Sequence, residues 1–304
     1  MKITIAGANS FIGKRLVAIA EQERDTLGAL EIVAVIRKGS PYRGILDTYR
    51  NVEIVECNME DYSHLGDLTG KGDCFIDLAW NGSRGTTRQD HELQKFDYES
   101  SMAAMKSMAE TGYKTLVSSG SQAEYGIFSD VITEETPCNP NTEYGKYKLQ
   151  IFHETTELAR SYGCRFIEPR YFSLYGPGDY EKTLIMTCIK KMLHDENVEL
   201  NDCTQIWDYM YVDDAIRALI GLCQNEKASG VFNFATGKHK MIREFVMDIH
   251  EALNSRSKVE FGEANYNGLI INLMPNIKKL EIYTKWAPTT TFTDGIKLTA
   301  ESFG

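Results

Sequence analysis

This 304-residue chain opens with a short apolar run, a glycine-bounded turn and a helical pattern. This opening constrains the fold more than any other feature of the sequence. Residues 2–6 are mostly apolar, the turn 7–13 has glycine at both ends, and apolar residues then recur at helical spacing. Small turn residues let a backbone approach a pyrophosphate, whose charge faces the amides that open the helix. Ser10 stands where the dinucleotide fingerprint has its central glycine, so a plain strand-to-helix loop stays an alternative. The pattern predicts a dinucleotide site at Gly7, Asn9, Ser10, Phe11, Ile12 and Gly13.

Strand and helix patterns continue to alternate as far as residue 170. Further strands are predicted at 31–36, 52–56, 74–79 and 115–118, and a helix at 92–111. This alternation, without internal repeats, predicts an α/β fold with a doubly wound parallel sheet. Ligands bind at the carboxyl ends of the strands in such sheets, so the residues that follow each strand are candidates for binding.

Basic residues follow the second predicted strand. Arg37 and Lys38 can pair with the 2′-phosphate of NADP, whereas a carboxylate there would bind the ribose of NAD. They favour NADP over NAD, and two exposed basic residues in a loop are the alternative. Asn58 and Met59, after the third strand, are expected in a loop on the adenine side. The loop 80–88, after the fourth strand, is expected near the substrate, where Arg84 and Arg88 can bind phosphate unless they are simply exposed.

A tyrosine and a lysine stand four residues apart in a helical pattern and share one helix face. A tyrosine has a pKa of about 10 in water. The ammonium of Lys148 is expected to lower the pKa of Tyr144, which could then exchange a proton with a carbonyl or an alcohol. Ser121, just past the strand 115–118, is the candidate donor that holds the substrate oxygen. Taken alone, the pair has a solvated helix face as its alternative.

Composition excludes several classes of function. The net charge of −10 argues against a nucleic-acid or polybasic membrane-binding surface. Seven scattered cysteines without Cys-x-x-Cys spacing, and six histidines without ligand spacing, predict free thiols and no metal. No segment has the apolar length of a signal peptide or a membrane span. These features predict a cytoplasmic protein whose partner is a small molecule or another protein.

Taken in order, the glycine turn, Ser121 and the Tyr144–Lys148 pair resemble the extended short-chain dehydrogenase/reductase family of nucleotide-sugar epimerases, dehydratases and 4-ketoreductases. Segments similar to the family run nearly to the end of the chain: Leu78-Ala79, Tyr125-Gly126, and residues 170–178, 208–214, 230–233 and 286–288. The resemblance implies a Rossmann domain for NAD(P) over residues 1–170. It also implies a smaller C-terminal α/β lobe, mainly 171–304, for a nucleotide sugar, with segments near 208–236 returning to the Rossmann domain.

The resemblance also implies roles for single residues. Tyr144 would be the acid/base, Lys148 would bind the nicotinamide ribose and lower the pKa of the phenol, and Ser121 would hydrogen-bond the sugar oxygen. A homodimer through the helices near 92–111 and 145–161 is implied too. Asp213 and Asp214 are interpreted as a loop-to-helix cap rather than as catalytic residues. Further contacts are implied with the cofactor for Leu78, Ala79, Trp80 and Tyr171, and with the substrate for Ser83, Arg84, Gln122, Ser173 and Trp207.

Four positions depart from the family pattern. Ser173 stands where epimerases carry asparagine and Trp207 where they carry arginine, both of which contact the nucleotide diphosphate in the family. Losing that guanidinium removes a bidentate phosphate contact and argues against the usual UDP-galactose epimerisation. Gln122 and Ala123 replace the Asp-Glu pair of the dehydratases, which disfavours water loss.

The hypothesis that combines these features is an NAD(P)-dependent enzyme acting at C4 of a nucleotide-activated sugar. The segments around Trp80, Ser121 and Trp207 are most similar to reductases of 4-keto-6-deoxy sugars. A 4-epimerase that oxidises and re-reduces the same carbon is the alternative. A third hypothesis is a non-catalytic NAD(P)-binding sensor, which the presence of Ser121, Tyr144 and Lys148 disfavours.

Overall fold

The computed structural model describes residues 1–263, 271–285 and 287–303. The chain divides into two compact units. The first unit comprises Met1–Ile127, Glu135–Tyr171 and Leu219–Phe232, and the second comprises Phe128–Glu134, Phe172–Ala218 and Asn233–Gly304. Among the described helices, none combines the length and apolar character that crossing a membrane requires.

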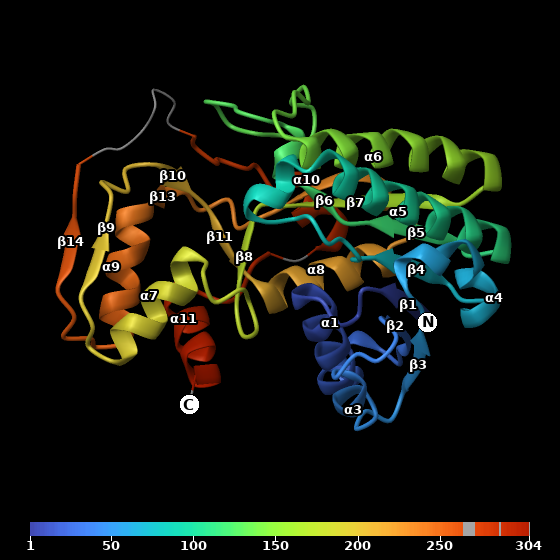
Figure 1. Ribbon diagram of the computed structural model, residues 1–304, viewed down its shortest axis with the longest axis horizontal. Coiled ribbons are helices and arrows are strands. Elements are labelled where there is room, and N and C mark those ends of the chain that lie inside the picture. Colours follow the sequence, from blue (N-terminus) through green and yellow to red (C-terminus); the bar gives the residue numbers. More distant parts are fainter. Residues whose placement is uncertain (264–270, 286, 304) are drawn as a thin grey trace. The chain divides into compact units, whose positions relative to one another are not determined.

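One large sheet forms the centre of the first unit (Figure 1). Its strands lie in the order β12-β7-β5-β4-β1-β2-β3, and β6 pairs with β7. Neighbouring strands from β3 across to β7 all pair in parallel. The strands are β1 (Lys2–Ala6), β2 (Glu31–Ile36), β3 (Val52–Glu56), β4 (Cys74–Asp77), β5 (Thr115–Ser118), β6 (Gly120–Ser121), β7 (Arg165–Tyr171) and β12 (Gly230–Phe234).

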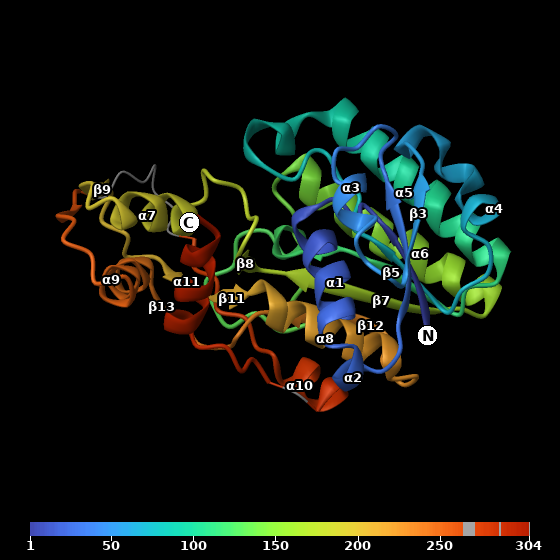
Figure 2. The same cartoon turned by 90° about the horizontal axis from the view of Figure 1, so that it is seen from below.

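Helices lie on both faces of this sheet, α5 and α6 on one side and α1 on the other (Figures 1 and 2). The predicted doubly wound parallel sheet is therefore confirmed. The helices are α1 (Phe11–Gln22), α2 (Arg24–Leu27), α3 (Arg43–Leu46), η1 (Met59–His64), α4 (Leu65–Thr69), η2 (Gly85–Gln89), α5 (His91–Thr111), η3 (Gln122–Glu124), α6 (Glu143–Tyr162) and α8 (Val212–Gln224).

Apolar side chains on α5 form a core with the sheet. Met105 and Met108 on α5 belong to one buried cluster with Phe75 on β4 and Leu116 on β5. Each such side chain contributes about 1.5–3 kcal/mol when it leaves water. Parallel strands that are covered on both faces must be apolar on both, which explains why β2 is buried at every residue but its first.

The second unit consists of two-stranded pairs and short helices around an aromatic core. Phe245 and Phe292 pack with ring centroids 4.7 Å apart, and Tyr175 lies 5.2 Å from Phe292. The pairs are β8 (Ser173–Tyr175) with β11 (Tyr209–Tyr211), β9 (Val198–Leu200) with β14 (Val259–Phe261), and β10 (Ile206–Trp207) with β13 (Lys240–Met241). The helices are α7 (Leu184–Leu193), α9 (Ile242–Ala252), α10 (Lys278–Thr284), α11 (Phe292–Ala300) and η4 (Glu301–Phe303).

Most of the predicted strand bounds are confirmed, but the end of the fourth is wrong. The strand stops at Asp77 because the carboxylate of Asp77 accepts a hydrogen bond from the Ala79 backbone N–H at 3.0 Å and turns the chain. The predicted helix 92–111 begins one residue earlier, at His91, where the side chain of Asp90 accepts from the N–H of Leu93.

The predicted cap at Asp213 and Asp214 is also wrong. Both lie within the first turn of α8, after Val212. The carboxylate of Asp214 accepts from the Thr290 backbone N–H at 2.8 Å, so it holds a distant loop rather than the start of its own helix. The predicted segment 286–288 includes Trp286, which lies outside the described residues.

Candidate active site

The glycine turn folds into a cradle around Gly7 and Gly13, where a larger residue would not fit. Gly7 has a φ of +73°, and a Cβ built on it would lie 2.8 Å from the Ala79 nitrogen. A Cβ on Gly13 would collide with the carbonyl oxygen of Gly7. Ser10, in place of the central glycine, caps α1, because its hydroxyl accepts from the Gly13 backbone N–H at 3.1 Å. The serine therefore stabilises the helix start that the turn needs.

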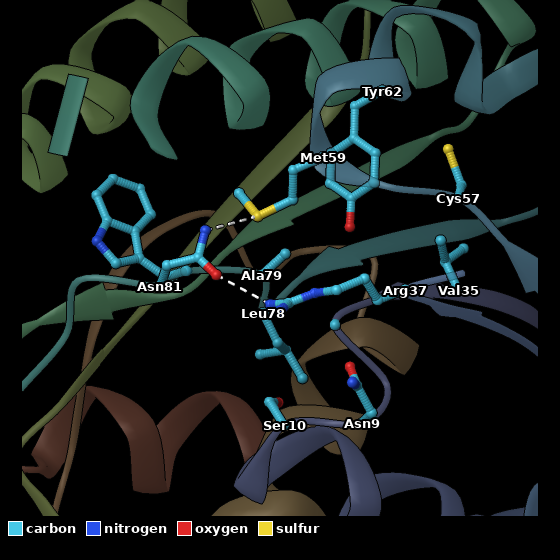
Figure 3. Close-up of a pocket in the computed structure, with 12 residues that line it drawn as sticks. Asn9, Ser10, Val35, Arg37, Cys57, Met59, Tyr62, Leu78, Ala79 and Asn81 are labelled. Carbon is cyan, nitrogen blue, oxygen red and sulfur yellow. Dashed lines mark hydrogen bonds between the residues drawn. The ribbon is translucent and has the colours of Figure 1, made fainter. Parts of the chain in front are cut away.

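A cavity of about 210 Å³ opens beside this cradle (Figure 3). It brings together residues that follow the first four strands, as expected of a parallel sheet. The sequence did not single out Val35, Cys57, Tyr62 or Asn81. Val35, Cys57 and Asn81 lie at or soon after a strand end, which was the available signal, whereas Tyr62 lies within η1. The residues that line the cavity are Gly7, Asn9, Ser10, Val35, Arg37, Cys57, Met59, Tyr62, Leu78, Ala79, Trp80 and Asn81.

The two basic residues after β2 have different surroundings. Arg37 lines the cavity and donates to the Asn81 side-chain oxygen at 3.0 Å (Figure 3). Lys38 forms an ion pair with Asp61 at 2.9 Å, and the hydrogen bond to that carboxylate raises the pKa of Lys38. Asn58 accepts from the backbone N–H of Lys38 at 3.1 Å. Arg37 is thus the basic side chain placed at the cavity.

Helix α6 places the tyrosine and the lysine on its buried face. Thr142 caps the helix by accepting from the Gly145 N–H, and Tyr144 and Lys148 are 8% and 3% exposed. The Lys148 ammonium donates to the Ser119 carbonyl oxygen at 2.7 Å. It lies 3.7 Å from the centroid of the Trp80 ring and 5.9 Å from that of Tyr144. The ammonium is therefore held mainly by Trp80 and Ser119.

The expected lowering of the phenol pKa by the lysine was wrong for this structure. Burial raises the pKa of Tyr144, and the hydrogen bond with Ser121 and the charge of Arg88 oppose that rise. Burial also lowers the pKa of Lys148 to about 8, against nearby carboxylates such as Asp77 that raise it. The Lys148 ammonium does not lower the pKa of the phenol as expected, because it faces the Trp80 ring and the Ser119 carbonyl rather than the phenol oxygen.

Ser121 is fixed beside the phenol by a short helical turn. Its backbone N–H donates to Glu124 at 2.6 Å, and its hydroxyl accepts from the Ala123 N–H at 3.2 Å. This reciprocal capping box starts η3, in which Gln122 is the first residue. Strand β6 pairs Ser121 with Tyr171 on β7. The Ser121 side chain counters the rise in the pKa of Tyr144, so the two side chains lie near each other.

Behind Ser121 lies a buried cluster of ionisable side chains that the sequence analysis did not predict. Arg170 donates through Nε to Glu124 at 2.8 Å and to Glu168 at 3.0 Å, and all three side chains are at most 2% exposed. A Cβ on Gly120 would lie 2.7 Å from the Glu168 side chain, so the glycine makes room for the cluster. Two charged residues on one face of a buried strand, at positions 168 and 170, were the available signal.

The remaining predicted substrate residues lie in two places. Ser83 and Arg84 belong to the loop before η2 in the first unit. Ser173 and Trp207 lie in the second unit, where the indole N–H of Trp207 donates to the Ser173 hydroxyl at 2.7 Å. Two of the four positions that depart from the family pattern therefore contact each other. Within the described residues, no group of three or more His, Cys, Asp or Glu side chains could hold a metal ion.

Comparison with known proteins identifies the family. The model of the NAD dependent epimerase/dehydratase family matches residues 3–235. The chain belongs to this family. It is an NAD(P)-dependent enzyme of the extended short-chain dehydrogenase/reductase type, as the resemblance predicted.

Named relatives of this family member have low identity but match along most of their length. The dTDP-6-deoxy-L-talose 4-dehydrogenase (NAD(+)) of Aggregatibacter actinomycetemcomitans is 24% identical over 86% of this chain and 94% of its own. The structure of UDP-glucose 4-epimerase from Thermotoga maritima, with UDP-glucose, superposes with a TM-score of 0.86 at 22% identity, covering 100% and 98% of the chains. UDP-glucuronic acid 4-epimerase from Bacillus cereus, in complex with NAD, has a TM-score of 0.82 at 19% identity, covering 99% and 96%.

Proposed function

We propose that this enzyme acts at C4 of a nucleotide-activated hexose and reduces a 4-keto-6-deoxy sugar with NADPH. The observation that carries the proposal is the buried phenol of Tyr144, with Ser121 near it and Lys148 one helical turn further on. This is the set of groups that a ketone oxygen needs: a donor that holds it and an acid that protonates it. The relative named as a 4-dehydrogenase of a 6-deoxy sugar nucleotide supports the choice of carbon and sugar class.

The residues present fit a dinucleotide. The cradle of Gly7 and Gly13 has no room for a Cβ, and the amides that open α1 suit a pyrophosphate. When bound, the nicotinamide would supply the hydride. Arg37, at the cavity, and Lys38, once released from Asp61, supply the positive charge that favours a 2′-phosphate. The proposed cofactor contacts are Gly7, Asn9, Ser10, Phe11, Ile12, Gly13, Arg37, Lys38, Asn58, Met59, Leu78, Ala79, Trp80 and Tyr171, with Tyr144 and Lys148.

The protein's own groups then handle the proton. In the reducing direction Tyr144 gives its phenolic proton to the ketone oxygen, on which charge develops, while Ser121 holds that oxygen in place. Lys148 binds the ribose of the cofactor. In the oxidising direction the Tyr144 phenolate takes the proton from the alcohol. Each step therefore needs one defined protonation state of Tyr144.

The sugar nucleotide is proposed to contact Ser83, Arg84, Gln122, Ser173 and Trp207. Because Trp207 and Ser173 form an uncharged pair, the diphosphate charge must be met by other residues. We also propose that residues 1–170 bind the cofactor and that residues 171–304 mainly bind the nucleotide. Two further parts of the proposal are a homodimer through α5 and α6 and a cytoplasmic location.

A 4-epimerase is the second candidate. The superposition with UDP-glucose 4-epimerase gives the shared fold, and the same Ser121 and Tyr144 would serve an oxidation followed by reduction at one carbon. In an epimerase the cofactor stays bound and is regenerated, so no net consumption of reduced cofactor accompanies turnover. A non-catalytic sensor is disfavoured because all three proposed catalytic side chains are present.

The decisive experiment mixes the purified enzyme with a nucleotide-linked 4-keto-6-deoxyhexose and either NADPH or NADH, and follows the absorbance of the reduced cofactor. Stoichiometric consumption supports the reductase and identifies the cofactor. Interconversion of UDP-hexoses without consumption would transfer the assignment to the epimerase.

A variant tests the mechanism. Tyr144→Phe is expected to lower kcat by about 10²–10⁴-fold while cofactor binding persists, since general acid catalysis has that magnitude. Tyr147→Phe, on the same helix with its hydroxyl 3.4 Å from His91 at the surface, is the matched control and should retain activity. A fully active Tyr144→Phe enzyme would overturn the mechanism.

A further inference from the structure

The loop after β4 is held rigidly by one buried side chain, Gln94 on α5. The amide oxygen of Gln94 accepts from the indole N–H of Trp80 at 2.9 Å. Its amide nitrogen donates to the carbonyl oxygens of Gly82 at 2.6 Å and Thr87 at 2.8 Å. Gln94 is 0% exposed, and its hydrogen bond to Gly82 is buried. One residue thus fixes both ends of the loop that carries Arg84 and Arg88.

The far end of this loop reaches the start of α6. The side-chain oxygen of Gln89 accepts from the backbone N–H of Glu143, the first residue of α6, at 3.3 Å. Arg88, next to Gln89 in η2, then lies with its guanidinium carbon 4.8 Å from the centroid of the Tyr144 ring. The Trp80 ring meets the same phenol edge-on, at 5.9 Å and 79°. Two side chains of one anchored loop therefore contact the Tyr144 ring.

Arg88 lies closer to that ring than Lys148 does. The Lys148 ammonium lies 5.9 Å from the Tyr144 centroid, further than the guanidinium of Arg88, and is engaged by Ser119 and Trp80. A cation over an aromatic face is attracted to its π electrons, and the attraction grows when the ring carries a full negative charge. The position of Arg88 therefore favours the phenolate over the phenol.

We propose that Arg88 is a positioning residue that stabilises the phenolate form of Tyr144 and holds its ring in place for proton transfer at C4. The proposal rests on the acid/base role of Tyr144 given above. The family resemblance assigns stabilisation of the phenolate to Lys148 alone, whereas this proposal assigns part of it to Arg88. Arg88 acts through the tyrosine and need not touch the substrate.

Other charged groups also surround the phenol. Arg84 acts in the same direction as Arg88, whereas the carboxylate of Glu124, on η3, acts in the opposite direction. Lys148, on the same helix, is itself surrounded by Asp77, Asp97, Glu124 and Glu168. These groups remain in place when Arg88 is substituted, so a change in the titration of Tyr144 reports the loss of the Arg88 charge.

The test measures the titration of the phenol directly. A fluorinated tyrosine at position 144 brings ionisation of the phenol into a pH range where the protein is stable, and fluorine NMR follows it. Arg88→Gln is expected to raise the pH of half-ionisation by about one unit, the effect of a partly screened charge about 5 Å away. Arg88→Lys should recover part of the shift. Arg160→Gln removes one exposed guanidinium from the surface of α6 and should leave the titration unchanged.

The pH dependence of turnover provides the second readout. In the oxidising direction activity requires the phenolate, so Arg88→Gln should move the rising limb of kcat to higher pH by the same amount. In the reducing direction activity requires the neutral phenol, so the falling limb of kcat should also move to higher pH. A folded Arg88→Gln enzyme with the titration and both limbs of the native protein would overturn the proposal. Failure of the proposed function is distinguishable, because it would appear as an active Tyr144→Phe enzyme whatever the effect of Arg88.

Discussion

Replacing Glu168 by glutamine should change how the stability of the protein depends on pH. Glu168 is fully buried, and burial, reinforced by the neighbouring carboxylate of Glu124, raises its pKa well above the ordinary value of 4.5. Arg170 opposes this rise, but its single Nε–H is shared between the two carboxylates. Among the described residues, Glu168 Oε1 has no hydrogen-bond partner. The folded protein therefore holds a proton on Glu168 that the unfolded chain releases near pH 4.5.

The sign and size of the effect follow from proton linkage. Above pH 4.5 the folded state binds one more proton at this site than the unfolded state, so stability falls as pH rises towards the folded pKa. Where the folded Glu168 is protonated and the unfolded one is ionised, the slope approaches about 1.4 kcal/mol per pH unit. Glutamine cannot titrate, so Glu168→Gln removes this slope. The Tm of the variant should therefore rise relative to that of the native protein between pH 5 and pH 7, by roughly 1.5 °C for each kcal/mol in a chain of 304 residues.

Calorimetry at pH 5 and pH 7 measures the difference. Glu157→Gln is the control, because Glu157 pairs with Arg160 at the surface and both side chains are exposed. Its Tm should follow that of the native protein at both pH values. If the curves of Tm against pH for Glu168→Gln and the native protein run parallel, Glu168 is ionised in the folded state and the reasoning fails.

Two further substitutions test the cofactor cradle and the edge of the sheet. Gly13→Ala should weaken dinucleotide binding at least tenfold in titration calorimetry, because the new Cβ collides with the Gly7 carbonyl oxygen. Gly44→Ala is the control and should bind normally, since a Cβ there meets nothing within 4 Å. Equal affinities of the two variants would contradict the role of Gly13 in the cofactor site. Arg165→Met should lower the free energy of unfolding by about 3 kcal/mol in urea, since charge-assisted hydrogen bonds to carbonyl oxygens at 222, 223, 225 and 228 are lost. A loss below about 1 kcal/mol, no larger than that of Arg160→Met at the surface, would show that these bonds contribute little net stability.

The parts of the fold that depend on local pattern were predictable. Strands such as 31–36 and 115–118 are apolar runs between turns, and their bounds match the sequence prediction. The end of β4 was not predictable, because it depends on where the Asp77 side chain finds a donor. The predicted alternation of strands and helices sufficed for the parallel sheet, since a parallel connection requires a crossover helix.

The candidate site was predictable in its residues but not in its contacts. A tyrosine and a lysine at helical spacing share a face wherever the helix lies, so Tyr144 and Lys148 could be named from the sequence. The direction of the Lys148 ammonium depends on Trp80, which comes from a loop far back in the chain. The role of Gln94 has no signal in the sequence, because its partners are backbone carbonyls and an indole. Contacts of this kind require the packed structure.

The edge strand β12 has a consequence for how the protein is made. The first unit is completed only by Leu219–Phe232, which returns after the chain has left for the second unit. Until β12 emerges from the ribosome, β7 is an open sheet edge whose residues are almost all buried in the finished protein. At usual rates of synthesis this gap lasts roughly 3–12 s. An unpaired apolar edge is a template for aggregation, so β7 presents this hazard at this stage of translation until β12 pairs with it.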